Sequence, residues 1–172
     1  PQWPRAWQMT PWVGKREQGG AIREVGPHLF HQVLHNFGPV RRVLATMDYP
    51  QDPEAAENGA AGLLELESGQ MVSVSLMCNL PRPETVSLTV FGSTGALGMV
   101  EWTKPVGALG AEPLAPLPVD EPAPAGLLTN LAAAVRGQQA DLCGLDVGLQ
   151  IQGVLEAWER SAQTANWAPV GE

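Results

Sequence analysis

The dipeptide Gly38-Pro39 separates two sequence patterns and limits the fold more than any other feature. Before it, apolar residues recur every three or four positions, which is typical of a helix. These residues are Ile22, Val25, Leu29, Phe30, Val33, Leu34 and Phe37. Glycine followed by proline is a strong stop signal, so the helix is expected to end near Phe37. Pro27 lacks an amide hydrogen and clashes with the carbonyl four residues earlier. The helix therefore either begins near Gly26 or has a distorted first turn.

After this stop signal the period of the apolar residues changes to two, which predicts a meander of antiparallel strands. The expected strands cover residues 40–49, 60–67, 71–79, 84–91 and 96–102. The short connections at 68–70 and 92–95 predict tight hairpins. Residues 104–124 are rich in proline, alanine and glycine, so we expect a long loop with room for a short edge strand over 112–118.

The two ends of the chain complete the pattern. Closely spaced prolines predict an extended start, with a short strand at 6–10. Helical spacing returns over 125–137 and 144–165, and 166–172 is expected to add a last extended piece. Strands flanked by helices indicate an α+β fold. We expect an open-faced sandwich, in which a mostly antiparallel (mixed) sheet of about five to six strands carries helices on one face.

The composition excludes several classes of partner. The chain has 172 residues, 44% of them hydrophobic, and 18 acidic against 10 basic side chains give a net charge of −8. Binding to nucleic acid or to an anionic membrane surface needs clustered Lys and Arg. No apolar run approaches the roughly 20 residues of a membrane span. We therefore expect one domain with a real core and neither nucleic acid nor membrane as a partner.

The two cysteines, Cys78 and Cys143, form neither a metal-type spacing nor a disulfide framework. We expect two buried apolar thiols in a reducing cytoplasm, since no basic-then-apolar signal segment opens the chain. The first residue is not an initiator Met, so we interpret the sequence as a processed chain or a fragment of something longer.

No motif for a nucleotide phosphate is found in the sequence. Gly92, Gly95 and Gly98 have the wrong spacing for a dinucleotide-binding loop and fall in an expected hairpin, not between a strand and a helix. A phosphate-binding Walker loop and a nucleophile elbow are also missing.

All three histidines lie in the first expected helix, where Glu24, His28, His31 and His35 are spaced by four, three and four residues. Such spacing places them on one stripe of the helix. Three interpretations stay open. The stripe is a solvated polar face, or His31 and His35 chelate a metal such as zinc, or Glu24 orients His28 for proton transfer.

The segment Gly19-Gly20-x-x-x-Glu24-x-Gly26-x-His28-x-x-His31 resembles the signature of the Gfo/Idh/MocA oxidoreductases. In the second domain of that family, Gly-Gly precedes Asp-x-Gly-x-His-x-x-Asp on a helix. The later hairpin Val90-Phe-Gly92-Ser-Thr-Gly95-Ala-Leu and the ending Asn-Trp167-x-Pro-Val are also similar to the family. In this chain, Glu24 stands where the family has Asp, and His31 where it often has a second Asp.

The resemblance implies that residues 1–172 form the substrate-binding and oligomerisation domain of a two-domain oxidoreductase, whose N-terminal Rossmann domain is absent from this chain. His28 would be the acid/base that takes the proton from a substrate hydroxyl, with Glu24 beside it. Lys15 and Arg16 fall in a stretch that approaches the substrate in relatives, and His31 lies on the same stripe. Trp12 belongs to a Trp-rich start that packs on the core or lines a ligand cleft.

The resemblance also implies a cofactor and partners. NAD or NADP would be bound mainly by the absent domain, so no cofactor, NAD(P) affinity or dehydrogenase activity is expected for this chain alone. The substrate would be a sugar, inositol or polyol-like compound, and the open sheet face would form a homo-oligomer interface. Two alternatives remain: a non-catalytic ligand-binding or assembly module, and a metal-binding module built on His31 and His35.

Overall fold

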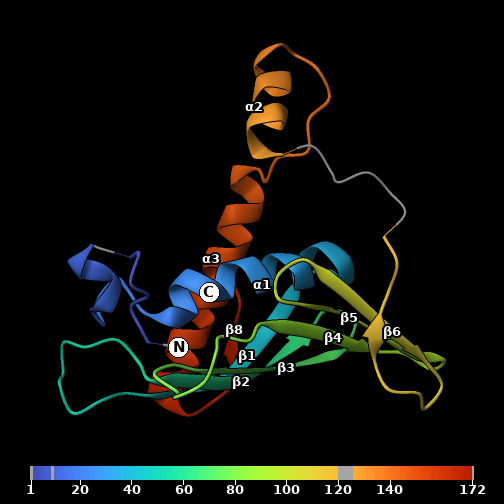
Figure 1. Ribbon diagram of the computed structural model, residues 1–172. Helices are drawn as coiled ribbons and strands as arrows, with labels where there is room; N and C mark the ends of the chain where they lie inside the picture. The colour runs from blue at the N-terminus through green and yellow to red at the C-terminus, as the bar shows by residue number, and fades with distance from the viewer. Residues whose placement is uncertain (1, 9, 120–125, 172) are drawn as a thin grey trace. The chain divides into compact units, whose positions relative to one another are not determined.

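The computed structural model describes residues 2–8, 10–119 and 126–171, and Figure 1 shows the course of the chain. The chain divides into two compact units. The first unit is Pro1–Arg82 with Cys143–Glu172, and the second unit is Pro83–Leu142. Each unit contains a four-stranded sheet, and the strand pairs within the described residues are antiparallel. The α+β class expected from the sequence is confirmed.

The sheet of the first unit has the strand order β3-β2-β1-β8. Its strands are β1 (Val40–Asp48), β2 (Gly59–Leu66), β3 (Met71–Met77) and β8 (Ala168–Pro169). Its helical elements are the 3-10 turn η1 (Pro11–Gly14) and the helices α1 (Ala21–Phe37) and α3 (Leu145–Thr164). The two helices pack against each other, and α3 also packs along β1 (Figure 1).

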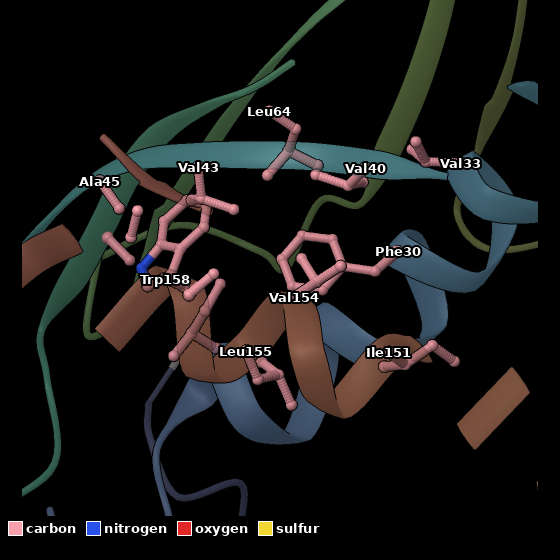
Figure 2. Close-up of a cluster of buried hydrophobic side chains, with 14 of the residues drawn as sticks. Phe30, Val33, Val40, Val43, Ala45, Leu64, Ile151, Val154, Leu155 and Trp158 are labelled. Carbon is pink, nitrogen blue, oxygen red and sulfur yellow. The ribbon is translucent and has the colours of Figure 1, made fainter. Parts of the chain in front are cut away.

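The core of the first unit forms where α1 and α3 meet the inner face of this sheet. Figure 2 shows the side chains of both helices pointing toward those of β1 and β2. Trp158 of α3 is fully buried, with its ring centroid 6.0 Å from that of Phe30, and its Nε1 donates to Met47 Sδ at 3.3 Å. A Cβ on Gly62 of β2 would lie 2.7 Å from the Trp158 ring. Glycine at this position therefore makes room for the largest side chain of the core.

The sheet of the second unit has the strand order β4-β5-β6-β7. Its strands are β4 (Ser87–Phe91), β5 (Gly95–Val100), β6 (Lys104–Leu109) and β7 (Ala115–Pro116), and its helix is α2 (Leu127–Val135). The helix α2 has no buried residue. The glycines of residues 92–98 lie in the turn and second strand of the β4–β5 hairpin, as predicted.

Most of the expected strands are present within a few residues of their expected bounds, but two predictions are wrong. The segment Lys104–Leu109, expected to be loop, is strand β6, because it pairs along its whole length with β5 despite Pro105 and Gly107. The short strand expected at 6–10 is not formed by its described residues, which include a turn closed by the Gln8 N–H and the Arg5 carbonyl. Residue 9 lies outside the described residues.

The strands that we expected in one sheet of five to six are divided between the two sheets. Residues 78–86 separate β3 from β4 and contain Pro81 and Pro83. Proline cannot donate to a strand ladder, so the meander is interrupted at this point. The short strands β7 and β8 fall inside the expected segments 112–118 and 166–172.

The helix α1 ends at Phe37, as predicted, with Gly38 after it at φ 91°. Of the two expected options, the start near Gly26 is wrong: the helix begins at Ala21 and continues through Pro27. Cys143 is exposed and Cys78 is half-buried, so the expectation of two buried thiols is wrong. Within the described part of the chain, no helix has both the length and the apolar character required to cross a membrane.

Candidate functional site

The two glycines before α1 are required by close packing around the first turn of the helix. A Cβ on Gly19 would lie 2.3 Å from the carbonyl oxygen of Trp12 and 2.4 Å from that of Val13. Gly20 has φ 110°, and a Cβ there would lie 2.3 Å from Oε2 of Glu57. The Gly-Gly pair therefore lets η1 on one side and a carboxylate on the other approach the helix start.

Glu57 occupies the N-terminus of α1 although it lies in the segment between β1 and β2. Its Oε1 accepts a hydrogen bond of 2.7 Å from the Ile22 N–H, and the residue is only 3% exposed. Burial raises the pKa of Glu57, while hydrogen bonds from the amides of Ile22, Glu57 itself and Ala21 act in the opposite direction. Sequence reasoning did not find this residue. The sequence held one signal for it: Gly20, at the N-cap, has no side chain that could accept from the first amides of the helix, so another residue had to supply an acceptor.

The helix α1 carries the predicted stripe. Glu24 and His31 are half-buried, whereas His28 and His35 are exposed. The Glu24 N–H donates to the Gly20 carbonyl at 3.1 Å, which places Glu24 in the first helical turn. His28 is one turn further on, beyond Pro27. The carboxylate and the imidazole of the proposed pair therefore belong to successive turns of one helix.

His31 and His35 stand edge to face, with ring centroids 6.0 Å apart. In the described part of the chain, no group of three or more His, Cys, Asp or Glu side chains is placed to hold a metal ion. Among the described residues, this histidine pair therefore has no third protein ligand beside it. Both structural and catalytic zinc sites require at least three protein ligands.

Of the residues predicted to bind substrate, Lys15 is held by an ion pair. Its Nζ lies 2.7 Å from Oε2 of Glu54, and the hydrogen bond and charge of Glu54 raise the pKa of Lys15. Lys15 also pairs with Ala55 as an isolated antiparallel bridge. The segment between β1 and β2 therefore contacts the stretch before Gly19-Gly20 as well as the helix start.

Arg16 and Trp12 are placed differently from Lys15. The Arg16 guanidinium stacks on the ring of Tyr49 at 3.7 Å from the ring centroid. Its Nε is one of two buried side-chain nitrogens without a hydrogen-bond partner among the described residues, and the other is Trp3 Nε1. Trp12, on η1, is 47% exposed. One exposed aromatic face and two cations thus lie in sequence just before the helix that carries Glu24 and His28.

Tyr49 was not predicted from the sequence to belong to this region. Burial raises its pKa, and the charge of Glu57 acts in the same direction, while Arg16 and Arg23 oppose the shift. Arg23 in turn pairs with Glu159 of α3, with Nε donating to Oε1 at 2.6 Å. Charged and phenolic groups from four segments therefore gather near the start of α1.

The residues that the structure describes do not form a cradle for a dinucleotide. Such a cradle needs a glycine-rich turn between a strand and a helix N-terminus. The glycines at 92, 95 and 98 belong to the β4–β5 hairpin. Within the described residues, α1 is preceded by two glycines, but the carboxylate of Glu57 occupies its N-terminus. An anionic pyrophosphate would meet a negative charge at that position.

The fold and the site define an α+β domain in which a two-glycine turn leads into a helix bearing a carboxylate and histidines. A family model described as the GFO/IDH/MocA C-terminal domain matches residues 1–98, and the chain belongs to this family. The resemblance observed in the sequence is thereby confirmed. A search of curated protein sequences found no match.

Solved structures show the same fold at low sequence identity. The chain is similar to the WlbA dehydrogenase from Bordetella pertussis in complex with NADH and UDP-GlcNAcA, with 24% identity, a TM-score of 0.72, and coverage of 95% of this chain and 49% of that chain. Levoglucosan dehydrogenase in complex with NADH and levoglucosan gives 14% identity, a TM-score of 0.78, and coverage of 99% and 56%. Aldose-aldose oxidoreductase from Caulobacter crescentus complexed with glycerol gives 20% identity, a TM-score of 0.73, and coverage of 88% of this chain and 48% of that chain. The chain spans about half the length of these proteins.

Proposed function

We propose that this chain is the substrate-binding half of an NAD(P)-dependent oxidoreductase that acts on the CH–OH group of a sugar, inositol or polyol-like compound. The observation that carries the proposal is the placement of Glu24 and His28 on successive turns of α1, directly after Gly19-Gly20, in a chain that belongs to the GFO/IDH/MocA C-terminal family. In this proposal residues 1–172 act as one functional domain.

His28 is the proposed acid/base. Oxidation of an alcohol removes a hydride from carbon and a proton from oxygen, so a proton acceptor is needed beside the hydroxyl. Imidazole exchanges a proton near neutral pH, and His28 is exposed on α1, where a hydroxyl can reach it. Glu24 lies one helical turn before His28 on the same stripe of α1. Glu24 is therefore proposed as the partner that orients and stabilises His28.

We assign the cofactor to the part of the relatives that this chain does not cover. Bound NAD or NADP supplies the hydride acceptor. Levoglucosan dehydrogenase and WlbA were solved with NADH, and each is about twice as long as this chain. Because the described residues form no dinucleotide cradle, we expect calorimetry of the isolated chain to detect no NAD(P) binding and assays to detect no dehydrogenase activity. Micromolar binding of NAD(P) to the chain alone would contradict this assignment.

The substrate class is inferred from the groups that precede α1. Trp12 exposes an aromatic face, which suits the apolar face of a sugar ring. Arg16, Lys15 and His31 add polar groups that can hydrogen-bond hydroxyls. The relatives were solved with a nucleotide sugar, with levoglucosan and with glycerol, all of which carry several hydroxyl groups. These likenesses support a polyhydroxy substrate for this chain.

The proposal is tested by substitutions in the full-length protein. Replacing a general base typically lowers the rate by about 10²–10⁴-fold, so His28→Asn should lower kcat by about that factor and leave cofactor affinity intact. Glu24→Gln should cost less, since the proton acceptor remains. His35→Gln, two turns beyond His28, is the matched control and should cost little.

Two outcomes would overturn this mechanism. Full activity in His28→Asn would leave the non-catalytic ligand-binding or assembly module as the better description. Equal loss of activity in His28→Asn, His31→Gln and His35→Gln would contradict a single acid/base, and metal analysis of protein purified without a His tag would then follow.

We also propose that a second copy of this chain covers the open face of the first unit's sheet. Side chains on the inner face, such as Leu64, are buried under the helices, whereas the alternate positions Ala61, Leu63, Met71 and Met77 are exposed. Exposed apolar strand positions are commonly covered by a partner. Sedimentation should show a concentration-dependent oligomer, and Leu63→Glu should dissociate it. A strict monomer at high concentration would contradict the proposal.

The expected setting is a reducing cytoplasm, which is supported by the absence of a disulfide between the described cysteines Cys78 and Cys143.

A further inference from the structure

The helix that carries the proposed proton-transfer pair has a weak point between its two members. Pro27 lies inside α1, so the Arg23 carbonyl has no amide hydrogen to accept from at the usual position four residues later. The missing bond would join residue 23 to residue 27, so Glu24 lies in the turn that this bond would close and His28 directly follows that turn. The first helical turn is therefore tied to the rest of α1 by fewer hydrogen bonds than an ordinary turn, and its position depends more on contacts from outside the helix.

The first turn also has no local cap. Gly20 stands at the N-cap and no side-chain hydrogen bond is made there by the cap residue. Glycine is in addition less restrained in its backbone than any other residue. A helix start with glycine at the cap and proline seven residues later needs an anchor from elsewhere in the chain.

Glu57 is such an anchor. Its carboxylate accepts the Ile22 N–H at 2.7 Å from a position 35 residues further along the chain. The space it occupies exists because Gly20 has no Cβ, since a Cβ there would lie 2.3 Å from Glu57 Oε2. A carboxylate at a helix N-terminus is favoured by the partial positive charge of the unpaired amides.

The backbone that holds Glu57 is itself fixed on both sides. The Ala56 N–H donates to the Gly14 carbonyl at 2.9 Å, and the Asn58 N–H donates to the Asp48 carbonyl at 2.8 Å. The Asn58 carbonyl accepts from the Cys78 N–H at 2.6 Å. Glu57 thus connects the helix start to one end of the central strands β1 and β2, and it can hold the first turn at a defined place.

Two arginines near the start of α1 also connect this region to other segments of the first unit. Arg23, in the first turn, pairs with Glu159 of α3, and Arg16 stacks on Tyr49. The charges of Arg23 and Glu57 attract each other, which acts to lower the pKa of Glu57.

We propose that Glu57 is a positioning residue: its buried carboxylate fixes the first turn of α1 and thereby sets the position of Glu24 relative to His28. This inference rests on the proposed function of that pair. The sequence Gly19-Gly20 then has a second purpose besides close packing, since it admits the anchor.

The test compares Glu57→Gln and Glu57→Ala with the matched controls Glu67→Gln and Glu67→Ala in the full-length protein. Glu67 is an exposed glutamate at the end of β2. Nuclear magnetic resonance of protein labelled at Ile and His would report the exchange rate of the Ile22 amide and the ring signals of His28 and His35. We expect Glu57→Ala to raise the exchange rate of Ile22 by at least about tenfold, as for loss of a hydrogen bond to a charged acceptor.

A selective change at His28 distinguishes positioning from a general loss of stability. In the folded Glu57 variants, the ring signals of His28 should move and those of His35, two turns away, should not. The Glu67 variants should change neither. In activity assays kcat should fall while cofactor affinity is kept. An unchanged Ile22 exchange rate and an unchanged His28 signal in Glu57→Ala would overturn the proposal. If Glu57→Ala does not fold, Glu57→Gln keeps the acceptor oxygen but loses its charge, so it should raise the Ile22 exchange rate by a smaller factor; an unchanged exchange rate and an unchanged His28 signal in that variant would overturn the proposal.

These readouts separate the two proposals. A shift of the His28 signal in a Glu57 variant, together with full activity of His28→Asn, would retain Glu57 as the anchor of the helix and reject the proposed function. A large rate loss in His28→Asn with no effect of Glu57→Ala on Ile22 or His28 would reject the anchor alone.

Discussion

The two units of this chain are built from the same kind of sheet but differ in what covers it. The largest fully buried side chains are Trp158, Phe30, Ile22, Leu64, Leu66, Val43, Val154 and Ser161, and all of them belong to the first unit. In the second unit, within the residues that the structure describes, Val106 of β6 is the one buried hydrophobic side chain. Both sheets have four antiparallel strands.

The difference shows that strands with alternating apolar and polar residues are enough to form a sheet. A buried core forms only where helices also cover one face of that sheet. In the first unit, α1 and α3 cover one face of the sheet and exclude water from it. In the second unit, α2 has no buried residue, and Phe91, Leu97 and Leu109 are 83%, 62% and 79% exposed. Since burial of apolar surface is the main favourable term in folding, the first unit should supply most of the stability of the chain.

The largest expected effect comes from the same substitution made in each unit. Phe30 is 1% exposed and Phe91 is 83% exposed. Phe30→Ala should lower the free energy of unfolding by about 3–5 kcal/mol because it leaves a cavity beside Trp158. Phe91→Ala should change it by no more than about 0.5 kcal/mol. Urea denaturation followed by circular dichroism measures both, and equal effects would break the comparison.

A pair of strand glycines gives a smaller effect of the same kind. A Cβ on Gly62 would lie 2.6 Å from the Leu44 carbonyl oxygen and 2.7 Å from the Trp158 ring, and neither can move freely. Gly62→Ala should therefore cost about 1–3 kcal/mol through overpacking. At Gly107 of the second unit, the nearest atoms are methyl groups of Leu117 and Leu97, which are partly exposed.

For Gly107→Ala we accordingly expect a change within about 0.5 kcal/mol, because those side chains can turn away. Thermal unfolding of the two variants beside the parent chain provides the measurement. A larger loss of stability for Gly107→Ala than for Gly62→Ala would contradict this expectation. It would show that the second unit is packed more tightly than the exposure of its side chains indicates.

The smallest expected effect is a pH dependence of the free energy of unfolding that arises from Glu57 of the first unit. Burial raises the pKa of Glu57 in the folded protein. Above the ordinary Glu pKa, the folded protein then binds more protons than the unfolded chain, so this residue's contribution to stability falls as pH rises. Glu57→Gln removes this contribution. The stability of the parent chain relative to Glu57→Gln should therefore decrease as the pH rises above the ordinary Glu pKa.

Urea denaturation at several pH values would show this trend, with Glu112→Gln in the second unit as the control for loss of one exposed carboxylate. A stability difference between the parent chain and Glu57→Gln that rises with pH would contradict the raised pKa of Glu57.

Much of the candidate site could be predicted from local patterns. Helical spacing alone placed Glu24 and His28 on one stripe, since side chains four residues apart share a helix face. Glu57 and Tyr49 could not be found in this way. They reach the helix start from a segment whose place is set by the pairing of β1 with β2 and by the bond from Ala56 to Gly14.

The sequence by itself determined where α1 ends, where β1 to β5 run and that α3 is a helix, because hydrophobic period and turn residues act over a few neighbouring positions. Only the tertiary structure decided that α1 starts at Ala21 and that Lys104–Leu109 is a strand. In each case a partner outside the segment itself satisfies backbone groups that the segment's own residues leave open. The Glu57 carboxylate accepts the Ile22 amide at the helix start, and β5 pairs with β6 despite its proline and glycine.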